Sequence, residues 1–194
     1  MLLQTRCACA CHPTDMTLEP RIELLESILE PWAVNIGADL EGYKNHCYRM
    51  IHLTQNFHVC TAEDKQKITI AAAHHDIGIW SDHTVDYLPP SKREALIYLT
   101  ANGLDAWREE IGLMIDEHHK IRAFKDPRFP LVEAFRKGDL VDFSMGWIRQ
   151  GVAKSTVKAL QTQFPNAGFH RMLIKSAGHW FRHHPISPPP FMKW

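Results

Sequence analysis

The amino-acid sequence predicts an all-α protein: a helical bundle with a metal site in the core between its helices. Three observations predict it. Apolar residues recur at helical spacing through most of the 194-residue chain, and no segment shows the alternating pattern of a strand. In addition, histidines and aspartates fall on the apolar faces of four expected helices. Buried groups of this kind are costly unless they are paired or bind a metal, so a metal site belongs to the prediction.

We expect one domain, residues 17–185, between two tails. A chain of 194 residues with 45% hydrophobic and 23% charged content can bury one ordinary globular core. Residues 1–16 are expected to form a flexible tail, because the spacing in CACACH differs from the C-x2-C geometry of structural zinc sites. Residues 186–194, which contain SPPPF, are expected to form an extended Pro-rich tail on the surface.

Charge and cysteine content limit the partners and the compartment. Basic and acidic side chains each number 22 and the pI is near 7.2, which argues against broad electrostatic binding to nucleic acid or to a membrane. The chain has no apolar run of about 18 residues and no secretory signal. Its five cysteines, an odd number, do not indicate a disulfide framework. We therefore expect a cytoplasmic protein that acts on a small molecule.

The helices can be placed from apolar spacing and from end signals. We expect them at residues 19–30, 39–58, 61–78, 91–103, 105–120, 131–144, 152–164 and 169–180. Thr61 with Asp64, and Ser91 with Glu94, have the spacing of capping boxes, so each pair should begin a helix. Gly78 is placed to end the third helix.

Histidine is the residue type that stands out, with 13 copies, several of them adjacent. His46, His75, His118 and Asp139 each lie on or beside the apolar stripe of a different expected helix. One metal ion would compensate all of them together. Imidazole and carboxylate ligands suit Mn, Fe, Co, Ni, Zn or Mg rather than Cu(I). His74 points about 100° away from His75 on the same helix, so we expect it to be a packing or hydrogen-bonded residue.

His46, the doublet His75-Asp76 and Asp139 in KGDLVD together resemble the H…HD…D signature of the HD-domain superfamily of metal-dependent phosphohydrolases. The resemblance covers about residues 40–145. It implies an HD-like helical bundle in which these four side chains bind one divalent ion and Asp76 is able to bridge to a second. It also implies hydrolysis of a phosphate ester, for which a nucleotide is one candidate, by a metal-activated water.

Two ligand positions stay open within this resemblance. Asp142 lies three residues after Asp139 and is the alternative for the last ligand. Members with two metals use further histidines between the doublet and the last aspartate, and His118 is the best of those present by its helical face. The expected helix at residues 91–103 has no histidine where such members carry one. We therefore expect one ion, with a second as an option.

The phosphohydrolase interpretation assigns roles to further residues. Asp76 and Lys120 are the expected catalytic residues, since phosphoryl transfer depends on positioning and positive charge. The expected substrate contacts are His83, in a loop of residues 81–90, and Lys92, Arg93, His119 and Arg122. The expected helix N-terminus at Ser91 is a further candidate for binding a phosphate.

Two other functions stay open from the sequence. A dinuclear iron oxygenase of the HD type, which would cleave a carbon–carbon or carbon–phosphorus bond, is favoured by His118 and by the abundance of histidine. A non-catalytic module that binds a nucleotide for regulation would keep the metal site without turnover. Two irons per chain with oxygen-dependent turnover would identify the first, and tight nucleotide binding without phosphate release would identify the second.

Overall fold

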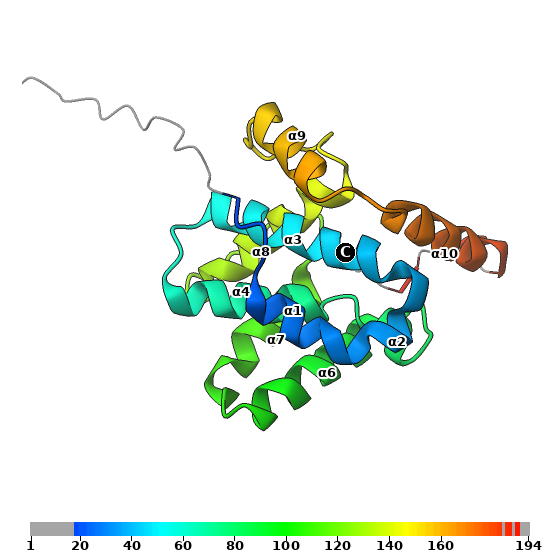
Figure 1. Ribbon diagram of the computed structural model, residues 1–194. Coiled ribbons are helices and arrows are strands. Elements are labelled where there is room, and N and C mark those ends of the chain that lie inside the picture. The colour runs from blue at the N-terminus through cyan, green and yellow to red at the C-terminus, as the bar shows by residue number, and fades with distance from the viewer. Residues whose placement is uncertain (1–17, 184, 188, 191–194) are drawn as a thin grey trace, which may run out of the picture.

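The computed structural model describes residues 18–183, 185–187 and 189–190, and all regular structure in this part of the chain is helical (Figure 1). The α-helices are α1 (Glu23–Leu29), α2 (Ala33–Ile36), α3 (Leu40–Phe57), α4 (Ala62–His74), α5 (Gly78–Ser81), α6 (Leu88–Ala101), α7 (Arg108–Glu117), α8 (Pro130–Phe143), α9 (Lys154–Gln163) and α10 (Phe169–His183). Short 3-10 helices lie at Glu30–Trp32, Gly37–Asp39 and Asp105–Trp107. The predicted all-α class is confirmed for these residues. The expected N-terminal tail lies outside them, as do residues 188 and 191–194 of the expected C-terminal tail.

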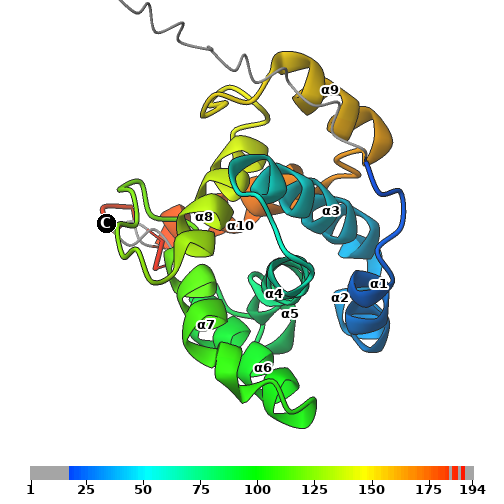
Figure 2. The ribbon, with the colours of Figure 1, turned by 90° about the vertical axis from the view of Figure 1, so that its left-hand side faces the viewer.

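Helix α4 lies in the middle of the bundle, in contact with α1, α3, α6, α7 and α8 (Figure 2). Its second half is buried on every side and mostly apolar, and Ile68, Ala71, Ala72 and Ala73 have no exposed surface. A helix that is apolar all round belongs inside a core, and the small alanines let neighbouring helices come close. The end of α4, and with it His75, therefore lies at the centre of the molecule.

Helices α3 and α8 form the most extensive helix pair of the bundle. Gly138 of α8 makes their close approach possible, because a Cβ at this position would lie 2.6 Å from Thr54 Oγ1 and 3.0 Å from Thr54 N of α3. The pairing carries polar side chains of both helices, His46 from α3 and Asp139 from α8, to the end of α4.

The turn from α4 to α6 passes through the short helix α5. Gly78 begins α5, and a Cβ there would lie 2.2 Å from the carbonyl oxygen of Tyr87, so only glycine lets the chain come this close to the start of α6. The N–H of Gly78 donates to Ser91 Oγ at 2.9 Å. Helix α4 itself ends at His74, so the prediction that it would continue to Gly78 is wrong. The glycine serves close packing instead.

Of the two predicted capping boxes, one is confirmed and one is wrong. Thr61 Oγ1 accepts the N–H of Asp64 at 3.1 Å, and the Asp64 carboxylate accepts the N–H of Thr61 at 2.8 Å, at the start of α4. Helix α6 begins at Leu88 rather than at Ser91, because the two prolines after Leu88 fit a first helical turn, where no N–H is needed. Ser91 is buried inside α6. The phosphate site expected at a helix N-terminus there is therefore not formed.

Helices α9 and α10 lie at the edge of the bundle, beyond α3 (Figure 1). Helix α10 continues past the expected end at residue 180 to His183. Pro189, expected in a surface tail, is buried. None of the helices in the described ranges combines the length and the apolar character that a membrane span requires.

Candidate metal centre

Five ionisable side chains from four parts of the chain meet at the end of α4. They are His46 of α3, His75 and Asp76 just after α4, His118 just after α7, and Asp139 of α8. Each is at most 3% exposed. These are the five residues that the sequence predicted as metal ligands, and the fold brings all five into one buried cluster.

Short distances connect the inner atoms of this cluster. His75 Nε2 lies 3.0 Å from His46 Nε2 and 3.3 Å from Asp76 Oδ2. On the other side of the aspartate, Asp76 Oδ1 lies 3.6 Å from His118 Nε2. His46 Nε2 also lies 3.8 Å from Asp139 Oδ1. Atoms that share one ion at about 2.1 Å stand roughly 3 to 3.5 Å apart, so the spacing around His75 Nε2 fits a metal ion.

Hydrogen bonds fix which nitrogen of each ring carries the proton. Nδ1–H donates to the carbonyl oxygen three residues earlier in His75 and in His118, both at 2.8 Å. In His46 the same nitrogen donates to the Asp142 carboxylate at 2.6 Å. These bonds leave Nε2 of all three rings as a lone-pair nitrogen that faces the cluster. Two lone pairs 3.0 Å apart repel one another unless a proton or a cation lies between them, which again fits a metal ion.

Two atoms of the cluster have no hydrogen-bond partner in the described part of the chain although they are fully buried: Asp76 Oδ1 and His118 Nε2. Buried polar atoms are normally satisfied, and leaving them unpaired costs free energy. Two sets of ligand atoms lie close enough to hold an ion, His46 with His75 and Asp76, and Asp76 with His118 and His119. These buried groups could therefore hold a metal ion, and Asp76 belongs to both.

Asp139 and Asp142, the two alternatives for the last ligand, have different surroundings. The Asp142 carboxylate accepts Nε–H and Nη2–H of Arg49 at 2.5 and 2.9 Å, in addition to His46 Nδ1–H. It therefore binds His46 at Nδ1, on the side of the ring that faces away from the cluster. Asp139 instead faces His46 Nε2 and lies 3.5 Å from His119 Nδ1. Of the two carboxylates, Asp139 is the one that faces the cluster, although neither set of close ligand atoms includes it.

Burial sets the protonation of this cluster. It lowers the pKa of His46 to about 4, against the opposing effect of the Asp142 carboxylate, and it raises the pKa of the Asp139 carboxyl to about 7. Burial alone would also raise the pKa of Asp142, but the hydrogen bonds from His46 and Arg49 hold it below its usual range. At neutral pH His46 is thus a neutral ligand, and Asp142 is a fixed negative charge.

Sequence reasoning missed Arg49 and expected His119 to contact substrate. Arg49 is fully inside the protein, where it binds Asp142 and donates Nη1–H to Phe164 O at 2.7 Å. Its position three residues after His46, on a helix face that packs inward, was the available signal. His119 lies beside the cluster, and its Nε2 is hydrogen-bonded to the Tyr87 hydroxyl. It is one of the residues that could hold an ion.

A pocket of about 270 Å³ is lined by His119, which lies beside the cluster. We call it the α10 groove, and it is lined by Tyr87, His119, Phe143, Met145, His170, Leu173, Ile174, Ala177, Phe181 and Pro189. The groove lies where the end of α8 faces α10, and among the described residues of the two possible ligand sets only His119 lines it.

The other side chains predicted to act on substrate do not line the α10 groove in the described part of the chain. Most of these cations pair with nearby carboxylates: Lys92 with Asp116 at 2.5 Å, Arg93 with Asp82 at 2.9 Å and Lys120 with Glu117 at 2.6 Å. His83 and Arg122 are exposed. The structure therefore brings together the predicted metal ligands and His119, and leaves these five predicted residues on other surfaces.

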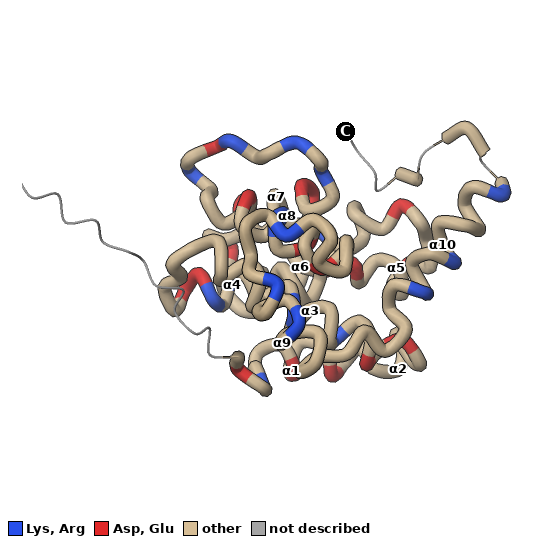
Figure 3. Tube along the Cα trace, turned by 90° about the horizontal axis from the view of Figure 1, so that it is seen from above, with Lys and Arg blue, Asp and Glu red and all other residues tan. Residues whose placement is uncertain are grey.

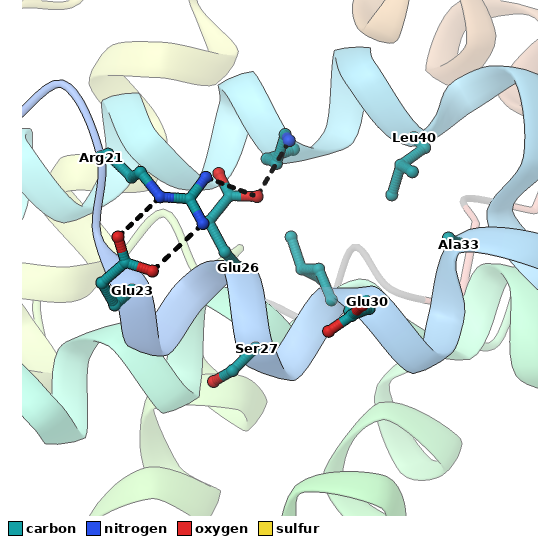
Figure 4. A pocket seen from close by; sticks show the side chains of 9 residues that line it. Arg21, Glu23, Glu26, Ser27, Glu30, Ala33 and Leu40 are labelled. Carbon is teal, nitrogen blue, oxygen red and sulfur yellow. Dashed lines mark hydrogen bonds and ion pairs between the residues drawn. The ribbon is translucent and has the colours of Figure 1, made fainter.

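A second pocket, of about 390 Å³, lies between α1 and α3 (Figure 4). Four of its charged side chains are bound in pairs: Arg21 donates to Glu23 at 2.6 Å, and Lys44 donates to Glu26 at 3.1 Å. No histidine lines it among the described residues. Among the described residues, this pocket has neither a group of possible metal ligands nor an unpaired buried polar atom, so nothing favours it as a site of chemistry.

Comparisons with models of protein families, with curated proteins and with solved structures found no significant match. Function therefore has to be argued from the buried cluster, the groove beside it and the spacing of the ligand residues.

Proposed function

We propose that this protein is a metal-dependent phosphohydrolase with an HD-like helical bundle. The observation that carries the proposal is the facing pair of Nε2 lone pairs of His46 and His75, 3.0 Å apart beside the Asp76 carboxylate. Together with Asp139, these residues supply the H…HD…D set in the expected order. They would hold one divalent ion. Asp76 would bridge to a second ion held by His118 and His119, which fits their grouping.

A divalent ion in this cluster would supply a Lewis acid and a water that is acidic enough to attack phosphorus near neutral pH. The protein's own residues position that chemistry. Asp142 and Arg49 lock the orientation of His46, and the backbone carbonyls lock His75 and His118. Because the ligands are almost fully buried, bulk water is excluded and electrostatic interactions with the substrate are strengthened.

The predicted catalytic role of Lys120 stays a prediction. Its ammonium group pairs with Glu117 at 2.6 Å, so it would have to leave this partner to contact a phosphate. Within the described residues the α10 groove is lined by no lysine or arginine. We therefore propose that most of the positive charge that stabilises the reacting phosphoryl group comes from the ion or ions, with Asp76 as the shared ligand.

One observation favours the second candidate function, the dinuclear iron oxygenase. Asp76, His118 and His119 form a second set of ligand atoms next to the first, as two ions would require. Metal content and oxygen use separate the oxygenase from the phosphohydrolase, and turnover separates both enzymes from the regulatory module.

The test measures metal per chain and phosphate release from nucleotides and other phosphate esters, for protein loaded with Mn, Fe, Co, Ni, Zn or Mg. We expect one or two divalent ions per chain and release of phosphate. His75→Gln should lose metal and activity, whereas His74→Gln should keep both, because His74 donates to Ile70 O and faces Tyr98 instead. Asp76→Ala should lose metal while the helical circular dichroism spectrum persists.

Three results would contradict the proposal. Two irons with substrate-dependent oxygen consumption would establish the oxygenase. Tight nucleotide binding at full metal occupancy without phosphate release would establish the regulatory module. Full metal content and activity in both His75→Gln and Asp76→Ala would show that the cluster is not the site.

A further inference from the structure

The α10 groove has a mostly apolar lining, although His119, one of the possible metal ligands, forms part of its wall. Apolar side chains of α10 recur along one stripe, at Leu173, Ile174, Ala177 and Phe181. They face Phe143 at the end of α8 and Met145 just after it. Several stay open to solvent: Ile174 is 70%, Met145 51% and Phe181 44% exposed. Exposed apolar side chains gathered around one pocket are typical of a ligand site.

The polar side chains of the groove are already hydrogen-bonded. Tyr87 and His119 bind one another. His170 Nε2–H donates to Asp142 O at 3.1 Å, and its other ring nitrogen contacts Asn166. A purine or pyrimidine base and a ribose each need several hydrogen-bond partners, and burying them without these partners costs affinity. The lining therefore favours a hydrocarbon over a nucleoside.

The outer face of α10 next to the apolar stripe is basic. Arg171, Lys175 and Arg182 share one side of the helix and are exposed. Figure 3 shows these charged positions along α10 in blue, the colour of Lys and Arg. Residues 143–194 contain no aspartate or glutamate, so all 22 acidic residues lie before them. The net charge of zero thus conceals a segregation of charge. An apolar groove beside a basic face is the pattern that binds an anionic amphiphile.

We infer that the substrate is a phosphate ester of a hydrocarbon alcohol, whose chain lies in the α10 groove while its phosphate reaches the metal cluster at His119. This inference rests on the proposed phosphohydrolase function and names the substrate class. It replaces the nucleotide that the family resemblance suggested as a candidate substrate. It also differs from the expectation, based on the charge of the whole chain, that the protein does not contact membranes. The volume of about 270 Å³ is close to the lower end of ligand pockets, so a short chain suffices to test it.

The first test is binding, which does not depend on turnover. Octylphosphonate and methylphosphonate share a head group that cannot be hydrolysed as an ester, and they differ only in the chain. For the full chain loaded with Mn²⁺, calorimetry should give octylphosphonate a dissociation constant at least about tenfold lower, since each buried methylene group favours binding. Equal dissociation constants would overturn the inference even if phosphate esters are hydrolysed.

Two surface variants test whether the hydrocarbon chain of the ligand lies in the α10 groove. Phe181→Ser should reduce the octyl-to-methyl preference by at least about threefold. Ile97→Ser removes a similarly exposed apolar side chain of α6 that does not line the groove, and it should leave the preference unchanged. An unchanged octyl-to-methyl preference in Phe181→Ser would mean that the hydrocarbon chain binds elsewhere, and it would overturn the inference.

Turnover separates this inference from the proposed function and identifies the source of the substrate. Octyl phosphate should be hydrolysed with a higher kcat/KM than adenosine monophosphate, and the reverse order would overturn the inference. Chain-dependent phosphonate binding without hydrolysis of any ester would contradict the proposed function alone. Faster release from phosphatidic acid in phosphatidylcholine vesicles than from octyl phosphate would indicate a lipid-surface source, and slower release a free metabolite. Both support the same chemistry.

Discussion

Asp142 illustrates how one carboxylate can matter for the proposed metal centre without facing the ion that the centre would hold. It accepts the Nδ1–H of His46 and two N–H groups of Arg49, so it fixes the ring that would bind the metal. Residues that orient a metal-binding histidine typically contribute a factor of about 10 to 100 in metal affinity.

Replacement of Asp142 by asparagine should therefore weaken metal binding by about 10- to 100-fold. Competition with a chelating dye measures the change. Asp116→Asn is the matched control, because Asp116 pairs with Lys92 on another surface, and its affinity should equal that of the wild type. An Asp142→Asn protein with wild-type affinity would show that His46 needs no support.

The pKa of Asp139 predicts how metal binding depends on pH. Burial raises this pKa to about 7, so below pH 7 the carboxyl group holds a proton that an ion must displace. Affinity should fall by about tenfold for each pH unit below 7 and level off above it. His46, whose pKa burial lowers to about 4, adds no dependence in this range. Asp139→Asn should bind more weakly at pH 8 and lose the slope, and a slope that persists would assign it to another group.

For single residues the sequence predicted the cluster well, because His46, His75, His118 and Asp139 interrupt apolar helical stripes and Asp76 directly follows His75. It could not place Arg49 beside Asp142, since the two lie far apart in the chain and nothing in local spacing pairs them. The same holds for the Tyr87 contact of His119. Partners of this kind come from tertiary packing.

Among the elements, the two similar capping patterns separate what local sequence can decide from what it cannot. Thr61 begins α4 as expected, and its box is exposed and local. Ser91 has the same pattern, but the prolines before it begin α6 earlier, and its hydroxyl is used by Gly78 N–H. Local signals thus compete, and the one that also allows burial of Ser91 prevails.

These two residues should respond differently to alanine. Thr61→Ala removes an exposed cap and should lower the free energy of unfolding by about 1 kcal/mol. Ser91→Ala leaves the buried N–H of Gly78 without an acceptor and should cost about 1 to 3 kcal/mol. Urea denaturation of both variants measures the difference. A Ser91→Ala variant as stable as the wild type would mean that the Gly78 bond is unimportant.

For the molecule as a whole, the metal centre should be part of the stability. An ion that binds only the folded protein stabilises it by about 2.7 kcal/mol at 100 times its dissociation constant. For a chain of this size that corresponds to a Tm about 5 to 10 °C higher. Differential scanning calorimetry with and without a chelator checks this. The Tm of His75→Gln should be the same with and without the chelator. A wild-type Tm that does not change when metal is removed would contradict a tightly bound ion.

The overall architecture was predictable only in part. Apolar periodicity predicted the all-helical class and most helices, because α3, α4, α6, α7 and α8 each have ten residues or more and carry recurrent apolar residues. The central place of α4 follows from its alanines only once the neighbours are known. The α10 groove depends on how α10 meets the end of α8, and its residues are far apart in the sequence. Such a surface has no local signature.

The contacts of His46 and Arg49 with residues 164–169 have a consequence for biosynthesis. All five cluster ligands lie before residue 140, whereas Arg49 donates to the carbonyl of Phe164, and the ring of Phe169 stacks on His46 at 4.4 Å between centroids. During translation the ligands therefore leave the ribosome before the residues that cover and brace them. In a nascent chain the support around His46 would therefore be completed last, when residues 164–169 pack against α3.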